Sequence, residues 1–125
     1  MKENNQSYEQ EKRKRSRISI NLNVIINFDG FKINTQTIDI SLKGIFCKPH
    51  ESVKAGKICS VLIWLTEEEK IEVKGQVVRS TSDGMAIDFQ KMDIDSFSHL
   101  YRLIRYNCND PDKLDKEFKY PAFVE

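Results

Sequence analysis

The sequence predicts a domain dominated by β-structure: a six-stranded antiparallel β-barrel with a C-terminal α-helix and a short helical appendage. Short segments of alternating apolar and polar residues recur between residues 18 and 89, and turn-forming residues separate them. After residue 93 the spacing of apolar residues becomes helical. At 125 residues the chain is long enough for one hydrophobic core and too short for two.

The first predicted strand covers residues 18–28, where every second residue is apolar. This period of two is typical of a strand with one buried face. Asp29-Gly30 follows it and favours a tight hairpin turn. The returning strand begins with Phe31 and Ile33 in one phase and continues with Ile38 and Ile40 in the other. The slip of one residue near Gln36 predicts a bulge or bend, which helps a sheet to curl into a barrel.

Four further strands complete the predicted barrel. The segment Ile58–Leu65 is almost wholly apolar, so we expect it to be central and Trp64 to belong to the core. Charged or small turn residues separate it from its neighbours. The other three segments are Gly44–Cys47, Ile71–Arg79 and Met85–Phe89.

Two helices are predicted after the strands. Apolar residues recur at spacings of three and four between Ile94 and Ile104, with Asp93 or Asp95 able to cap the start and Asn107 a plausible stop. Asp110-Pro111 then offers a second cap with proline at the first helical position. We expect that short helix to reach about residue 118.

The charge of the chain is concentrated rather than large. The net charge is +1, but residues 1–17 carry +3 and the remainder −2. A nucleic-acid-binding domain usually spreads its basic residues over a folded face, so this focus favours a small anionic target. The three cysteines show no CxxC pair, and the longest apolar stretch is too short to span a bilayer. We therefore expect a reduced, cytoplasmic protein without a signal peptide or transmembrane segment.

Two polar segments carry the functional signal. The first, Arg13-Lys14-Arg15-Ser16-Arg17, enters the first strand, and the second is Asp39-Ile40-Ser41-Leu42-Lys43-Gly44. The predicted hairpin brings them close in space. One arginine side chain can bind two phosphate oxygens at once, and it can also contact guanine. Asp39 and Ser41 share one face of an extended segment and can accept hydrogen bonds from a guanine edge, while Gly44 permits close backbone approach or a positive φ.

These two segments together resemble the paired motif of the PilZ domain, a bacterial receptor module for cyclic di-GMP. The resemblance rests on Arg13-xxx-Arg17 and Asp39-x-Ser41-xx-Gly44, and residues 84–89 are similar to the last barrel strand of the family. It covers roughly residues 12–107. It implies that the two arginines clamp phosphates and guanine, and that the Asp/Ser/Gly segment recognises the base. Further candidate ligand contacts are Lys12, Arg15, Lys43 and Arg79.

The expected organisation is a tail over residues 1–11, a barrel domain over 12–107 and a helical appendage over 108–125. The resemblance implies a cyclic di-GMP receptor whose N-terminal arm changes conformation on binding, folds over the barrel mouth and signals to a separate downstream protein. No cofactor, metal or catalysis is expected, since His50 and His99 stand without a nucleophile or metal-ligand spacing. Either a monomer or a dimer is compatible with the sequence.

Two alternatives stay open at this level. One is a protein-interaction module on the same barrel that works without nucleotide, although such relatives usually lack the arginines or the Asp/Ser turn. The other is a small-barrel binder of RNA or single-stranded DNA, which would call for exposed aromatic residues on a basic sheet face.

Overall fold

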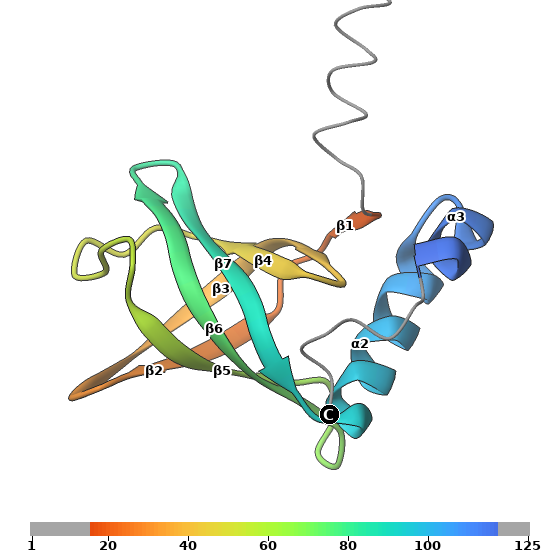
Figure 1. The fold of residues 1–125 in the computed structure, drawn as a ribbon, viewed down its shortest axis with the longest axis horizontal. Coiled ribbons are helices and arrows are strands. Elements are labelled where there is room, and N and C mark those ends of the chain that lie inside the picture. The colour runs from red at the N-terminus through yellow and green to blue at the C-terminus, as the bar shows by residue number, and fades with distance from the viewer. Residues whose placement is uncertain (1–15, 118–125) are drawn as a thin grey trace, which may run out of the picture.

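The structure is a computed structural model that describes residues 16–117. These residues form a closed six-stranded antiparallel barrel with two helices at one side, which confirms the predicted fold class (Figure 1). The strands are β1 (Arg17–Ser19), β2 (Asn23–Phe28), β3 (Phe31–Ser41), β4 (Gly44–Cys47), β5 (Ile58–Trp64), β6 (Lys70–Thr81) and β7 (Gly84–Met92). The helices are α2 (Ile94–Asn107) and α3 (Pro111–Glu117).

The barrel closes through β3. The sheet order is β1-β3-β2-β5-β6-β7-β4, and an additional pairing of β3 with β4 joins its two sides. β2 pairs with residues 31–36 of β3 and β1 with residues 39–41, so β1 and β2 follow one another along the same edge. They act as one broken barrel strand. The prediction of a continuous strand over 18–28 was therefore wrong at residues 20–22.

Thr37 explains the break. Its side chain is fully buried, and its hydroxyl donates to the Ile20 carbonyl (2.6 Å) and accepts from the Leu22 amide (2.9 Å). The hydroxyl thus replaces regular ladder bonds where β1 and β2 separate. The register between β3 and β4 also shifts between Thr37 and Asp39, which confirms the predicted bend in this part of β3.

The core contains the inward face of each barrel strand and one stripe of α2. Val61 and Ile63 of β5 are buried, so Trp64 points outward and is 48% exposed, with the Lys70 ammonium 5.4 Å from the centre of its ring. The expectation that Trp64 belongs to the core was wrong, because the alternation along the strand decides its direction despite its apolar neighbours.

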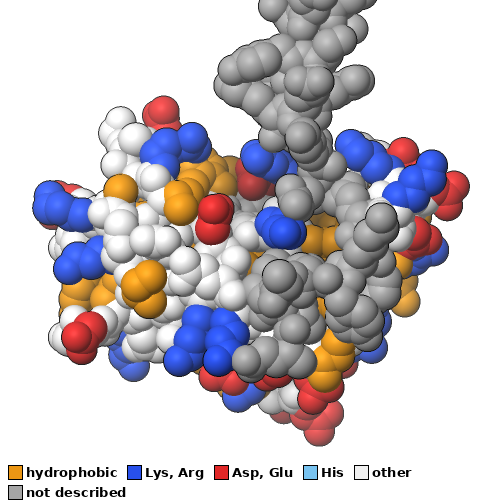
Figure 2. Space-filling view, viewed as in Figure 1, with side chains coloured by type: hydrophobic (Ala, Val, Ile, Leu, Met, Phe, Trp, Pro, Cys, Tyr) orange, Lys and Arg blue, Asp and Glu red, His pale blue; other side chains and the backbone are white. Residues whose placement is uncertain are grey.

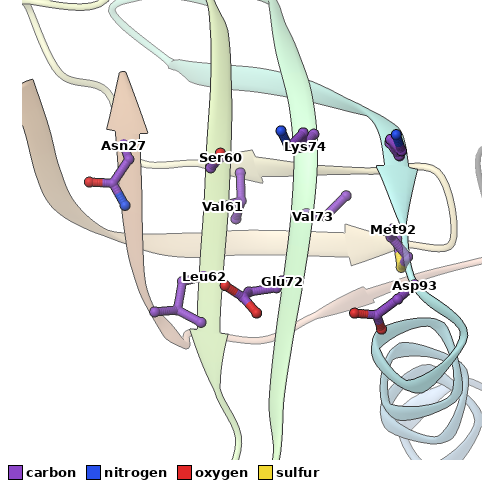
Figure 3. Close-up of a pocket in the computed structure, with 10 residues that line it drawn as sticks. Asn27, Ser60, Val61, Leu62, Glu72, Val73, Lys74, Met92 and Asp93 are labelled. Carbon is purple, nitrogen blue, oxygen red and sulfur yellow. The ribbon is translucent and has the colours of Figure 1, made fainter. Parts of the chain in front are cut away.

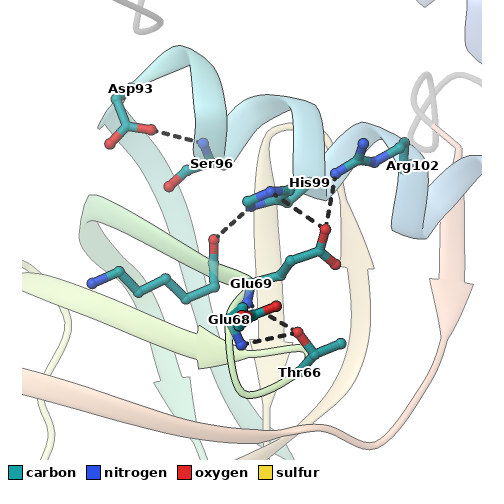
Figure 4. Close-up of polar contacts among 8 residues, drawn as sticks. Thr66, Glu68, Glu69, Asp93, Ser96, His99 and Arg102 are labelled. Atoms are coloured by element: carbon teal, nitrogen blue, oxygen red, sulfur yellow. Dashed lines mark hydrogen bonds and ion pairs between the residues drawn. The ribbon is translucent and has the colours of Figure 1, made fainter.

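Helix α2 starts where the sequence predicts and packs on β6 and β1. The Asp93 carboxylate accepts from the Ser96 amide (2.7 Å), and the Ser96 hydroxyl accepts from the Glu72 amide of β6 (3.0 Å). The imidazole Nδ1 of His99 donates to the Lys70 carbonyl (2.9 Å). Figure 4 shows the Asp93–Ser96 bond and the bond made by His99, together with an ion pair between Arg102 and Glu69 whose N–O distance is 3.5 Å. The start of α2 is therefore fastened to β6 and to the turn before it.

Helix α3 also begins at its predicted position. The Asp110 carboxylate accepts from the Lys113 amide (3.0 Å) and caps it. Tyr101 and Arg105 of α2 both donate to the carboxylate of Asp115, which joins the two helices. No helix among residues 16–117 is long and apolar enough to cross a membrane.

Candidate functional site

The structure places the two motifs side by side through strand pairing. Arg17 of β1 lies opposite Ser41 of β3, and Ser19 lies opposite Asp39. Between these pairs, Ile18 is buried against the core while Arg17 is exposed and Asp39 and Ser41 are half-buried. The described site residues therefore lie on the outer wall of the barrel. Most of the arm that is expected to fold over the barrel mouth lies outside the described residues. Lys12, Arg13 and Arg15 lie outside the described residues.

The Asp39–Gly44 segment forms a turn that Ser41 stabilises from within. The Ser41 hydroxyl accepts from the Lys43 amide (3.2 Å) and donates to the Gly44 carbonyl (3.4 Å). The Lys43 carbonyl in turn accepts from the Phe89 amide of β7 (2.8 Å). Ser41 is thus held in one place, and its oxygen keeps a second lone pair for a ligand donor.

Gly44 serves close packing. A Cβ atom at this position would lie 2.5 Å from the Ile87 carbonyl oxygen, in the strand that pairs with β4. The glycines with positive φ among residues 16–117 are Gly30, Gly56 and Gly84. Of the two reasons considered for a glycine at position 44, the close backbone approach is therefore the correct one.

The register of the sheet extends the site across three more strands. Asp39 lies opposite Phe46 of β4, Phe46 opposite Ala86 of β7, and Ala86 opposite Arg79 of β6. Because residues in register point to the same face of a sheet, these four side chains form one row on the outer wall. Arg79 is exposed, and its guanidinium carbon lies 5.6 Å from the centre of the Phe46 ring. Arg17 on β1 and the guanidinium of Arg79 above β4 therefore lie on the two sides of β3, the strand that carries Asp39.

Sequence reasoning did not single out Phe46. Its neighbours Ile45 and Cys47 are buried, while Phe46 itself is half-buried. The hydrophobic run Ile45-Phe46-Cys47 hid this difference, although the period of two from Ile45 would have placed Phe46 outward. Phe46 is an aromatic residue on the same face as the predicted ligand contacts.

The two buried cysteines, Cys47 and Cys59, do not supply a nucleophile. Burial, with smaller contributions from Cys59 and Asp39, raises the pKa of the Cys47 thiol to about 12. Burial also raises the pKa of Cys59 to about 11. Both thiols are protonated at neutral pH, and a protonated thiol is a poor nucleophile.

Other hollows on the barrel lie away from the predicted site residues. One of about 320 Å³ crosses the outer face of β5 and β6, between Asn27 on one side and Asp93 on the other (Figure 3). A second of about 770 Å³ is lined by uncharged residues that include Asn23, Asn34 and Trp64. Within residues 16–117, no group of three or more His, Cys, Asp or Glu side chains could hold a metal ion.

Charged side chains of both signs are interspersed on the visible face of the barrel (Figure 2). On this face the described residues do not form a continuous basic stripe. A binder of long nucleic acids would normally present such a stripe to the phosphate backbone, and the described residues on this face do not offer one.

Comparison with known proteins agrees with this geometry. A family model described as "PilZ domain" matches residues 11–106. The Bacillus subtilis inhibitor of motility (MotI/DgrA) is a similar solved structure, with 23% identity and a TM-score of 0.63 over 76% of this chain and 50% of its own. This chain thus spans half the length of that protein. The PilZ domain of CeSA from a cellulose-synthesizing bacterium is similar with 15% identity and a TM-score of 0.60, over 70% of this chain and 93% of its own. No curated protein matches the chain.

Proposed function

Because this chain belongs to the PilZ domain family, we propose that it is a receptor for cyclic di-GMP that transmits the signal to a separate protein. The observation that carries this proposal is the pairing of Arg17 with Ser41, one step from Asp39 on the same outer face. A guanidinium, a carboxylate and a hydroxyl side by side match the phosphates and the donor edge of a guanine nucleotide.

Each side chain has a distinct proposed role. Arg17, together with Arg13 of the preceding arm, binds phosphate oxygens and the acceptor atoms of guanine. The Asp39 carboxylate and the Ser41 hydroxyl accept from N–H groups of the base. Gly44 lets β4 approach β7 closely and so fixes the end of the turn that carries Ser41. Hydrogen bonds to charged groups contribute roughly 1.5–3 kcal/mol each, so each arginine is worth about one to two decades of affinity.

The proposed output is a conformational change of the arm that contains Arg13. This arm leads directly into β1, and β1 is held to β3 over three residues only. A ligand that contacts both arginines links the arm to the barrel wall and thereby changes the surface next to β1. A separate protein that recognises this surface would read the ligand-bound state.

Isothermal titration of the protein with cyclic di-GMP tests the proposal. We expect micromolar or tighter binding by the wild type and loss of binding in an Arg13→Ala/Arg17→Ala double variant. Arg102→Ala is a matched control, because Arg102 lies on α2 and pairs with Glu69. Cyclic di-AMP should bind much more weakly, since adenine lacks the N–H edge offered to Asp39. Absence of heat and of a thermal shift with the wild type at millimolar cyclic di-GMP would refute the proposal.

A further inference from the structure

We infer that Arg79 is a further ligand-binding residue of this site. Its guanidinium stacks on a guanine base, and the ring of Phe46 holds the Arg79 side chain in place. The inference rests on the proposed function, because it assigns one further contact for the same ligand. It concerns the side of Asp39 away from Arg17, where β4, β7 and β6 form the outer wall.

The first step is how Arg79 reaches the site. Arg79 belongs to β6, and β7 separates it from β4. The residue of β7 in the same row is Ala86, whose side chain is a single methyl group. The long Arg79 side chain therefore passes over β7 and places its guanidinium above the ring of Phe46. A larger side chain at position 86 would stand in this path.

The second step is what fixes Phe46. A Cβ atom on Gly84 would lie 2.5 Å from the Cζ atom of Phe46 and 2.9 Å from its Cε2 atom. The missing side chain of Gly84 is thus the space that the ring occupies, and the positive φ of Gly84 (155°) suits the backbone there to glycine. With the ring packed against this turn of the barrel, Phe46 provides a rigid base for the guanidinium.

The third step is the chemistry that remains available. Among residues 16–117, Arg79 forms no ion pair, and its described contact is the aromatic ring. A guanidinium is planar and weakly hydrated, and it stacks on aromatic rings. Because Arg79 is exposed, the side of its guanidinium away from Phe46 is open to a ligand. A guanine whose edge donates to Asp39 would have its face next to this guanidinium, in the same row of the sheet.

Titration of Arg79→Ala and Arg79→Lys with cyclic di-GMP tests the inference. Loss of a base stack should weaken binding about fivefold or more in the alanine variant. The lysine variant should be weakened similarly, because an ammonium keeps the charge but offers no plane for stacking. Arg102→Ala serves again as the arginine control and should bind as the wild type does.

Each outcome decides a different point. If the wild type binds and Arg17→Ala weakens binding while Arg79→Ala does not, the role of Arg79 is overturned and the proposed function stands. If Arg79→Lys binds as tightly as the wild type, the contact depends on charge alone and the stacking role is overturned. If the wild type itself does not bind, the proposed function fails and this inference fails with it.

A second pair of variants tests the positioning. Ala86→Leu should push the Arg79 side chain away from Phe46, and Phe46→Leu should remove the ring that supports it. Both should weaken cyclic di-GMP binding in the same direction as Arg79→Ala, and neither should weaken it further when combined with Arg79→Ala. Additive losses in the double variants would show that these residues act independently of Arg79, and would overturn the positioning role.

Discussion

The outer wall around Asp39 and the junction between α2 and β6 use the same residue types in opposite ways. At the junction, Ser96 bonds to β6, Asp93 caps the helix and Arg102 pairs with Glu69. On the wall, within the part of the chain that the structure describes, Arg17 and Asp39 form neither a side-chain hydrogen bond nor an ion pair.

This difference separates structural from functional polar groups. A polar side chain whose partners lie within the molecule contributes to folding, while one that keeps its hydrogen-bonding capacity at the surface is available to a ligand. Arginine and aspartate occur in both regions, so residue type alone does not distinguish the two uses. Matched substitutions should therefore change stability when they are made at the junction, and ligand affinity when they are made on the wall.

Thr37 should show the largest effect, because its buried hydroxyl is bonded within the molecule although it lies on the same strand as Asp39. Thr37→Val removes a buried hydroxyl that satisfies the Ile20 carbonyl and the Leu22 amide. We expect a loss of about 2–4 kcal/mol in the free energy of unfolding, since two partly buried backbone groups lose their hydrogen-bond partner. Urea denaturation measures it, with Thr35→Val as the less buried control. Equal stability of the two variants would contradict the role assigned to the Thr37 hydroxyl.

Substitutions of Arg17 and Arg102 should separate ligand affinity from stability. Arg17→Ala should weaken cyclic di-GMP binding by about tenfold to a hundredfold, because one charged contact is lost, and should leave the melting temperature of the ligand-free protein unchanged. Arg102→Ala should leave affinity unchanged and alter stability by less than about 1 kcal/mol, as is usual for an exposed ion pair. Titration and thermal melting of both variants check this. A loss of stability in Arg17→Ala comparable to its loss of affinity would argue against a ligand-binding role.

Substitution of Asp93 should change stability, and substitution of Asp39 should change affinity. Asp93→Ala removes the cap of α2 and should lower the free energy of unfolding by about 1 kcal/mol without changing affinity. Asp39→Ala should weaken binding of cyclic di-GMP and shift stability by less than about 0.5 kcal/mol. Chemical denaturation and titration of both proteins compare them directly. Wild-type affinity in Asp39→Ala would remove Asp39 from the site.

The smallest effect concerns pH and the contact between α2 and α3. Hydrogen bonds from Tyr101 and Arg105 lower the pKa of Asp115. Since the pKa of Asp115 is lower in the folded state, its stabilising contribution is present above the unfolded value of about 4 and is lost as the pH falls through the folded value. As the pH is lowered from about 6 to about 3, across the unfolded pKa of Asp115, the melting temperature should therefore fall slightly less in Asp115→Asn than in the wild type. Identical slopes would show that the contact contributes no measurable stability.

Much of the fold could be predicted from the sequence, because period and turn residues act locally. The Asp29-Gly30 hairpin, the bend in β3 and the start of α2 at Asp93 are local signals, and the structure confirms each of them. The break between β1 and β2 could not be predicted. The apolar alternation continues through Leu22, while the cause is the hydroxyl of Thr37 in the next strand.

The candidate site divides in the same way. The motif residues Arg17, Asp39 and Ser41 were found from their spacing, and the pairing of β1 with β3 brings them together. Phe46 was missed and Trp64 was assigned to the wrong face, because both lie in runs of apolar residues where the inward and outward positions look alike. The period of two fixes the direction of each residue only once one inward position is known, and in an apolar run that position depends on contacts with strands distant in sequence.

The position of Trp64 has a spectroscopic consequence. It is the only tryptophan of the chain, and its side chain is about half exposed on β5. β5 lies three strands from β4 in either direction around the barrel. Intrinsic fluorescence therefore reports on the wall opposite the turn that carries Ser41 and Gly44. A nucleotide that contacts only the wall around Asp39 should leave the emission spectrum of Trp64 unchanged. A change on titration would therefore indicate that binding alters the barrel as a whole.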